Sequence, residues 1–173
     1  MAGSAKTSER SWRYLIALGS NRRHARHGSP RSVLHAARKA LKRASLKIEV
    51  MSPVIETAPL GPSRRRYANA AAVVTAPYLP DELLSCLKRI ERQFGRRRGG
   101  ARWGERVLDL DLVLWEGGAW SSPGLTVPHV DFRHRRFVLG PAQRIASRWR
   151  DPLTGLTLRQ LHARLTRPRP LPR

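Results

Sequence analysis

The first part of the chain combines a continuous apolar run with a helical repeat of apolar positions. Tyr14–Leu18 is entirely apolar and leads into a Gly-Ser-Asn sequence, which predicts a buried strand that ends in a turn. In Pro30–Arg43 the apolar side chains recur at helical spacing, and Ser29 before the proline suits a helix N-cap. We therefore expect a strand followed by a helix.

The middle of the chain predicts three more strands and a second helix. Ile48–Thr57 and Tyr67–Ala76 are interpreted as strands, joined by a loop whose prolines and glycine exclude regular structure. In Leu79–Phe94 four large apolar side chains share one face, and Gly95 ends this predicted helix. Leu108–Trp115 is the most regular strand pattern in the sequence.

The order of these elements indicates the fold class. Strand, helix, strand, strand, helix, strand is the order of an α+β, ferredoxin-like fold, whose βαββαβ core forms an antiparallel sheet with helices packed on its faces. Beyond this core we expect a helix over Phe137–Arg148, shortened or kinked by Pro141, and a short helix over Leu158–Leu165.

The length of 173 residues fits one compact domain. We expect it to span residues 13–166, between a disordered tail at 1–12 and a Pro- and Arg-rich tail at 167–173. Cys86 is the only cysteine, which excludes an intramolecular disulfide. No segment approaches the roughly 20 apolar residues that span a bilayer, so we expect a cytoplasmic protein that does not enter membranes.

The charge of the chain is strongly positive, with 34 Lys and Arg against 12 Asp and Glu and a net charge of +22. Nucleic-acid binding, a polyanionic substrate or a compositional habit of the source genome would each produce such a balance. All but 5 of the basic residues are arginines, and they are scattered over the whole chain. This scatter favours the compositional explanation for most of them, and charge alone does not separate the partners.

Asp109 and Asp111 form the clearest candidate for a chemical site. Alternation along the predicted strand sends the leucines to one face and both aspartates to the other, with Cα atoms about 7 Å apart. Two carboxylates at this spacing suit Mg²⁺ carrying nucleotide phosphates. The alternative is that they form only the solvated face of an amphipathic strand, although Asp is disfavoured in strands.

An arginine-rich loop precedes this strand and suggests phosphoryl-type chemistry. Transfer between phosphates requires cations that offset charge on the transferred oxygens, and the loop offers Arg96, Arg98, Arg102 and Arg106. The chain contains no GxxxxGK[ST] loop and no protein-kinase signature, so any ATP site is of another kind. His129, after a Val-Pro pair, is a candidate phosphate contact or a structural histidine.

Four motifs together resemble the 6-hydroxymethyl-7,8-dihydropterin pyrophosphokinase family of the folate pathway. The most specific is RWGERVLDLDLV, at residues 102–113. The others are LGSN at 18–21, ETAPLGP followed by YANAA between 56 and 71, and LTVPH at 125–129. The resemblance covers about residues 13–146 in the order and approximate spacing of the family.

The resemblance implies transfer of pyrophosphate from ATP to 6-hydroxymethyl-7,8-dihydropterin, giving AMP and the pterin diphosphate in tetrahydrofolate biosynthesis. It implies two Mg²⁺ ions on Asp109 and Asp111, with Asp109 also helping to draw the proton from the attacking hydroxyl. Arg96 and Arg106 would close over the phosphates and support the transfer. The expected partners are these two small molecules, with no specific nucleic acid, and the expected state is a monomer.

By the same resemblance, pterin and ATP are bound by two sets of residues. The implied pterin-binding residues are Thr57, Leu60, Tyr67, Asn69, Trp103 and Phe137. The implied ATP-binding residues are Glu91, Arg98, Leu112, Thr126, His129 and Arg135. A flat heterocycle rich in donors and acceptors is well held by aromatic faces and a side-chain amide, which agrees with the first set.

The sequence departs from the family at four positions, and two other functions compete with this interpretation. Lys88, Gly124, Val130 and Ala58 stand where the family commonly has Gln, Arg, Tyr and Pro. A nucleic-acid-binding module would fit the charge, but its central strands would carry exposed aromatics and the aspartate pair would be unexplained. An inactive family member is the third possibility, although the aspartates and both loop arginines are present.

Overall fold

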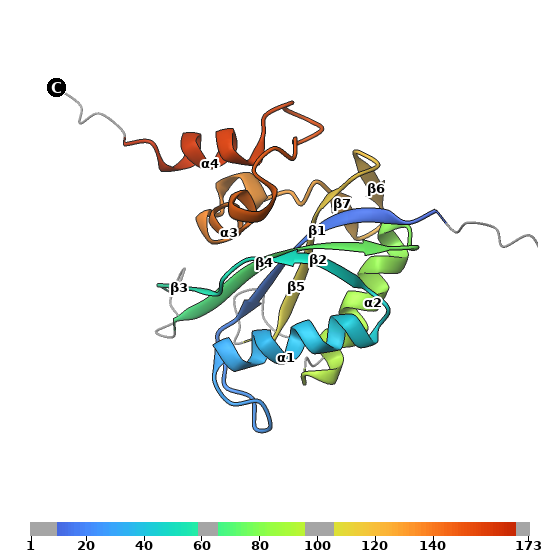
Figure 1. Ribbon diagram of the computed structural model, residues 1–173, viewed down its shortest axis with the longest axis vertical. Helices are drawn as coiled ribbons and strands as arrows, with labels where there is room; N and C mark the ends of the chain where they lie inside the picture. Colours follow the sequence, from blue (N-terminus) through green and yellow to red (C-terminus); the bar gives the residue numbers. More distant parts are fainter. Residues whose placement is uncertain (1–9, 59–65, 96–105, 169–173) are drawn as a thin grey trace, which may run out of the picture.

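The computed structural model describes residues 10–58, 66–95 and 106–168 as a central sheet between two layers of helices (Figure 1). The predicted positions Leu60, Arg96, Arg98, Arg102 and Trp103 lie outside these ranges. No helix within the described ranges is long and apolar enough to cross a membrane.

The sheet has the strand order of the predicted ferredoxin-like fold. Its main path is β2 (Lys47–Met51), β4 (Tyr67–Ala76), β1 (Trp12–Ser20) and β5 (Asp109–Trp115), and every adjacent pair is antiparallel. The short strand β3 (Ile55–Thr57) pairs with the same β4. The α+β, ferredoxin-like prediction is therefore confirmed.

The prediction of one continuous strand over Ile48–Thr57 is wrong. The segment Ile48–Thr57 is divided into β2 and β3, with Ser52, Pro53 and Val54 between them. Ser52 replaces the regular ladder with its own bonds: its N–H donates to the Ala71 carbonyl at 2.8 Å, and its Oγ accepts from the Ala71 N–H at 3.0 Å. Because Pro53 has no N–H to donate, the regular pairing stops there.

The first helical layer covers one face of the sheet. Helix α1 (Pro30–Arg43) starts at the Ser29 N-cap, whose side chain accepts from the Ser32 N–H, and α2 (Pro80–Gln93) follows Leu79. Both helices bury an apolar stripe against alternate residues of the strands, as their periodicity predicts. This layer forms the larger of the two cores.

The second helical layer covers the opposite face and comes from the C-terminal part of the chain. It consists of the short 3-10 helix η1 (Phe132–His134), α3 (Arg136–Ala146) and α4 (Leu158–Thr166). Helix α3 continues through Pro141 and ends two residues before the predicted Arg148. A second core lies between these helices and the sheet, and Phe132 is 1% exposed in it.

Strand β5 departs from the alternation that its sequence predicts. Leu108, Leu110 and Leu112 pack into the first core as expected, but Leu114 packs into the second. A register shift between β1 and β5 at this point, where Leu15 pairs with Leu114 and Ile16 with Leu112, moves Leu114 to the other face. The expectation that all four leucines share one face is therefore wrong.

The edge of the sheet beyond β5 carries a hairpin that the sequence did not predict. Strands β6 (Trp120–Ser122) and β7 (Leu125–Val127) pair with each other in a separate two-stranded sheet. Asp81, at the start of α2, accepts hydrogen bonds from Trp120 Nε1 at 3.0 Å and Ser122 Oγ at 2.5 Å, which fixes the hairpin against the helix.

Candidate active site

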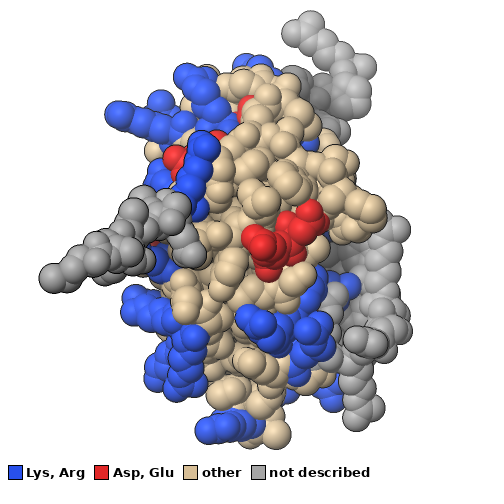
Figure 2. Space-filling model, turned by 90° about the vertical axis from the view of Figure 1, so that its right-hand side faces the viewer, with Lys and Arg blue, Asp and Glu red and all other residues tan. Residues whose placement is uncertain are grey.

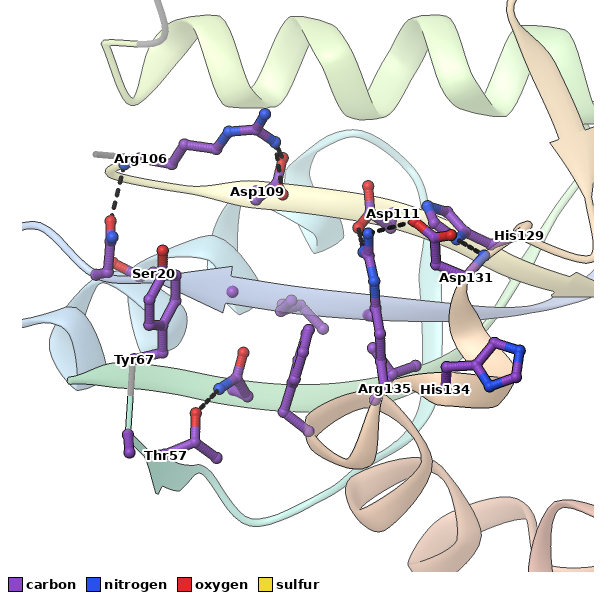
Figure 3. A pocket seen from close by; sticks show the side chains of 18 residues that line it. Ser20, Thr57, Tyr67, Arg106, Asp109, Asp111, His129, Asp131, His134 and Arg135 are labelled. Carbon is purple, nitrogen blue, oxygen red and sulfur yellow. Dashed lines mark hydrogen bonds and ion pairs between the residues drawn. The ribbon is translucent and has the colours of Figure 1, made fainter. Parts of the chain in front are cut away.

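A pocket of about 580 Å³ opens at one end of the central strands, on the face that carries α3 (Figure 3). Strands β1, β4 and β5 form its floor, and the segment 129–138 forms one wall. Its lining residues are Ala17, Leu18, Gly19, Ser20, Asn21, Thr57, Ala58, Tyr67, Asn69, Arg106, Asp109, Asp111, His129, Asp131, His134, Arg135, Phe137 and Val138.

The floor of the pocket is deep because the central strand has small residues there. Gly19 of β1 lies between Asn69 of β4 and Asp109 of β5 in one row across the sheet. Ala17 occupies the corresponding place beside Asp111 in the next row. A larger side chain at either position would fill the space between the carboxylates and the amide, so the small residues create the cavity.

Asp109 and Asp111 both line this pocket, as the strand pattern predicts. Asp109 accepts two hydrogen bonds from Arg106 Nη1, at 2.9 and 2.8 Å. The backbone of Arg106 is held in turn by Asn21, whose Oδ1 accepts from the Arg106 N–H at 2.8 Å. The turn after β1 thus positions the arginine that faces the first aspartate.

The second aspartate faces another arginine on the opposite wall. Figure 3 shows Arg135 extending from the start of α3 towards β5, between Asp111 and Asp131. Its Nη2 lies 2.7 Å from Asp131 Oδ2, and its Nη1 lies 3.8 Å from Asp111 Oδ2. Asp131 therefore holds the guanidinium next to the aspartate pair.

The surroundings of Asp111 disfavour its negative charge. Burial raises its pKa, and the neighbouring charge of Asp109 raises it further, against the opposing effects of His129, Lys88 and Arg135. A bound cation would remove the repulsion between the two carboxylates. The pair is thus arranged to attract positive charge.

The donor set fits a magnesium ion that is shared with phosphate. Mg²⁺ takes oxygen ligands in octahedral geometry. In proteins it is usually bound by one or two carboxylates and by phosphate oxygens of the substrate, and it keeps several water ligands. Within the described ranges no group of three His, Cys, Asp or Glu side chains could hold a metal ion. The residues present match an ion that arrives with its substrate better than one in a closed protein cage.

The other end of the pocket is aromatic and amide-lined. Tyr67 and Phe137 both line it, and Asn69 is only 4% exposed. The Asn69 Nδ2 donates to Thr57 Oγ1 at 2.8 Å, which fixes the amide and leaves its carbonyl oxygen on the Gly19 side. Such an end can hold a flat, polar heterocycle.

Three residues predicted to bind ATP do not line this pocket. Leu112 is 2% exposed in the first core, and Thr126 is exposed on β7. Glu91 is fully buried, and its Oε1 accepts from the Leu110 N–H at 2.7 Å and from Lys88 Nζ at 3.0 Å. Their roles towards ATP stay predictions, whereas Glu91 contacts the backbone between the two aspartates.

Asn21 and Asp131 are pocket residues that we did not predict from the sequence. Asn21 ends the Gly-Ser-Asn sequence, which predicts a turn. That sequence does not indicate that the Asn21 side chain accepts from the Arg106 N–H. Asp131 follows the Val-Pro-His-Val segment as an isolated acid. Its partner is four residues away in a 3-10 turn that no periodicity reveals.

The molecular surface agrees with the composition. Figure 2 shows one face on which Lys and Arg side chains are spread widely, while Asp and Glu form only small groups. The positive charge is therefore not confined to one patch on this face. The view is consistent with a compositional origin for most of the arginines.

Comparison with known proteins identifies relatives over most of the chain. Residues 15–147 match the family model described as 7,8-dihydro-6-hydroxymethylpterin-pyrophosphokinase. A Haemophilus influenzae 2-amino-4-hydroxy-6-hydroxymethyldihydropteridine pyrophosphokinase is 41% identical over 134 residues, covering 76% of this chain and 80% of that protein. The Pseudomonas aeruginosa protein of the same name is 37% identical over 142 residues, covering 81% and 84%.

A solved structure supports the fold independently of these sequences. Plasmodium falciparum HPPK-DHPS superposes with a TM-score of 0.70 over 91% of this chain, at 12% sequence identity. The chain spans 41% of that larger protein. At this identity the likeness concerns the fold alone.

Proposed function

Since the chain belongs to the 7,8-dihydro-6-hydroxymethylpterin-pyrophosphokinase family, we propose that it transfers pyrophosphate from ATP to 6-hydroxymethyl-7,8-dihydropterin. The products are AMP and the pterin diphosphate, and the reaction belongs to tetrahydrofolate biosynthesis. The observation that carries the proposal is that a carboxylate pair and an aromatic, amide-lined recess lie in the same pocket.

The recess accounts for the binding of the pterin. The pterin ring lies between Tyr67 and Phe137, and the Asn69 amide and the backbone near Thr57 form hydrogen bonds with the polar edge of the ring. Because Thr57 fixes the Asn69 amide, the site is oriented before the substrate arrives. Leu60 and Trp103, outside the described residues, complete this site in the proposal.

The carboxylate end accounts for the phosphates. Asp109 and Asp111 would hold Mg²⁺, which when bound would neutralise negative charge on the phosphate oxygens. Arg106 and Arg135 already lie beside these carboxylates, and His129 lines the same wall. The further contacts proposed for ATP are Glu91, Arg98, Leu112 and Thr126, and Arg96 supports the transfer.

The reaction is a displacement at the β-phosphorus of ATP. The pterin hydroxyl oxygen forms a bond to that phosphorus while the bond to the oxygen bridging the α-phosphate breaks, so AMP leaves. The hydroxyl proton passes to the Asp109 carboxylate. Arg106 turns from Asp109 to the phosphates and offsets the negative charge on the transferred oxygens.

A coupled assay for AMP release tests the proposal directly. The purified chain is incubated with ATP, with and without 6-hydroxymethyl-7,8-dihydropterin and with and without Mg²⁺. We expect AMP only when both are present. AMP release that ignores the pterin, or no release from the folded protein, would contradict the proposed reaction.

Binding of RNA is the competing function, because the chain is strongly basic. An RRM-like domain binds RNA on an open sheet face. In the described part of this chain, α1 and α2 pack on one face and η1, α3 and α4 on the other. Tight, sequence-dependent RNA binding in a filter assay at physiological salt would support this alternative.

A further inference from the structure

Asp151 is a fully buried carboxylate that the proposed chemistry does not use. It lies beyond residue 147, where the family match ends, in the connection between α3 and α4. Arg133 donates to both of its oxygens, from Nε at 2.8 Å and Nη2 at 2.7 Å. Thr154 Oγ1 donates at 2.6 Å and the Leu153 N–H at 3.2 Å.

These bonds stabilise the charged form of Asp151. Burial by itself raises the pKa of a carboxyl group, but the donors from Arg133, Thr154 and Leu153 outweigh it, and the pKa is lowered. A two-point guanidinium–carboxylate contact also fixes direction, because both groups are planar. Arg133 is therefore held in one orientation.

Arg133 lies in the segment that forms one wall of the pocket, but it does not line the pocket itself. It lies in η1 between Asp131 and Arg135, which both line the pocket. Local backbone hydrogen bonds connect this segment internally: the His134 N–H donates to the Asp131 carbonyl at 3.1 Å, and the Arg135 N–H donates to the Phe132 carbonyl at 3.3 Å. A shift of Arg133 would therefore carry its neighbours with it.

The exact position of η1 matters because the contact between Arg135 and Asp111 is already long. Arg135 reaches Asp111 at 3.8 Å, a distance that a small rotation of η1 would lengthen beyond an ion pair. Phe132 anchors η1 in the second core, but an apolar contact is not directional. The His129 N–H bonds the Val113 carbonyl at the start of the segment, and the Arg133–Asp151 pair adds a directional restraint at η1.

We infer that Asp151 is a positioning residue for the active-site pocket. Through Arg133 it holds η1 so that Arg135, which directly follows η1, faces the carboxylate pair. The inference rests on the proposed function only where ATP binding or turnover is measured. The position of the segment is measurable without any activity.

The decisive variant removes the contact without leaving a buried charge. In the double variant Arg133→Met with Asp151→Asn, the apolar chain fills the space of the arginine. The Asn Oδ1 still accepts from the Leu153 N–H, and its Nδ2 donates to the Thr154 hydroxyl oxygen, which replaces the bond that Thr154 donates to Asp151. Replacing both partners of a buried ion pair is often neutral for stability, whereas removing one is not. The matched control is Arg136→Met, because the exposed Arg136 bonds the Leu165 carbonyl at 3.1 Å and does not line the pocket.

Two activity-independent measurements decide the inference. We expect amide hydrogen exchange in residues 132–135 of the double variant to accelerate about tenfold, with β1 and β4 unchanged. Calorimetric titration with ATP and Mg²⁺ should show affinity about tenfold weaker, and kcat/KM should fall about 10- to 100-fold. The Arg136→Met control should match the wild type in all three.

Other outcomes would overturn the inference. Unchanged exchange in 132–135, or an equal acceleration throughout the sheet, would show that the pair does not hold this segment specifically. Unchanged ATP affinity in a variant with faster local exchange would show that the segment does not position the site. If the wild type releases no AMP, the proposed function fails, while exchange and titration still decide the role of Asp151.

Discussion

Arg106 Nη1 donates to both carboxylate oxygens of Asp109, at 2.9 and 2.8 Å. In the proposed reaction the same carboxylate holds Mg²⁺ and the same guanidinium faces the phosphates. Under this proposal the two groups would form an exchangeable pair: an ion bound together with ATP would take the place of Arg106 at Asp109, and the guanidinium would then be available to the nucleotide.

The first prediction follows from this exchange. Arg106→Met should strengthen Mg²⁺ binding in the absence of nucleotide by about threefold, since the competing cation is gone. Turnover should nevertheless fall about 100-fold, since charge on the transferred oxygens is no longer offset. Calorimetry and the AMP assay measure the two effects. Arg144→Met, an exposed change on α3, should alter neither.

Substitution of either aspartate should remove activity. Asp109→Ala and Asp111→Ala each delete a carboxylate from the pair, and we expect turnover to fall by about 100-fold or more at saturating substrate. Surface Glu116→Gln serves as the control for loss of one negative charge. Near-normal turnover in both aspartate variants would sink the metal assignment.

The Asn69 amide should determine affinity for the pterin more than for ATP. Asn69→Ala removes the oriented amide, and we expect the KM for the pterin to rise about 10-fold or more. Thr57→Val removes only the hydroxyl that accepts from Nδ2, so a smaller rise is expected. Initial rates at varied pterin and fixed ATP separate these effects, and an equal rise in the KM for ATP would argue against the assignment.

Glu91 should contribute strongly to stability. Glu91→Ala leaves Lys88 without this buried partner and the Leu110 N–H without its acceptor, so the free energy of unfolding should fall by about 3 kcal/mol. Glu91→Gln keeps an acceptor for Leu110 and should lose about 1 kcal/mol. Urea denaturation measures both, and equal losses would show that the backbone bond contributes little.

The acid sensitivity of the fold should depend on Asp151. Its pKa is lower in the folded chain than its ordinary value of 3.8, so its stabilisation is complete above pH 3.8 and is lost as the pH falls through the folded value. The Arg133→Met, Asp151→Asn variant should therefore lose less stability than the wild type between pH 5 and pH 2. Denaturation at stepped pH tests this; parallel curves would refute it.

The sequence predicted the elements well where local patterns determine them. The apolar spacing of Pro30–Arg43 predicted a helix with the bounds that the structure shows, and Ser29 caps it as expected. The pairing of Asp109 and Asp111 on one face also follows from alternation within a single strand. Such features need no knowledge of distant residues.

The remaining features depend on contacts between distant segments. The break at Ser52 depends on a bond to Ala71, and the displacement of Leu114 depends on the register with β1. The bond from the Leu110 N–H to Glu91 was not predicted, because a helix pattern does not reveal which carboxylate meets a strand amide. The bond from Arg133 to Asp151 joins η1 to the connection between α3 and α4, so no local motif predicts it.

The contact between Glu91 and Leu110 also has a consequence for behaviour at high concentration. β5 ends the main path of the sheet, and unpaired amides on such a strand invite pairing with a second chain. The Glu91 carboxylate occupies the Leu110 amide, and the His129 N–H occupies the Val113 carbonyl at 3.0 Å. One carboxylate of α2 and one residue of the pocket wall thereby make the edge of β5 less available to a second chain.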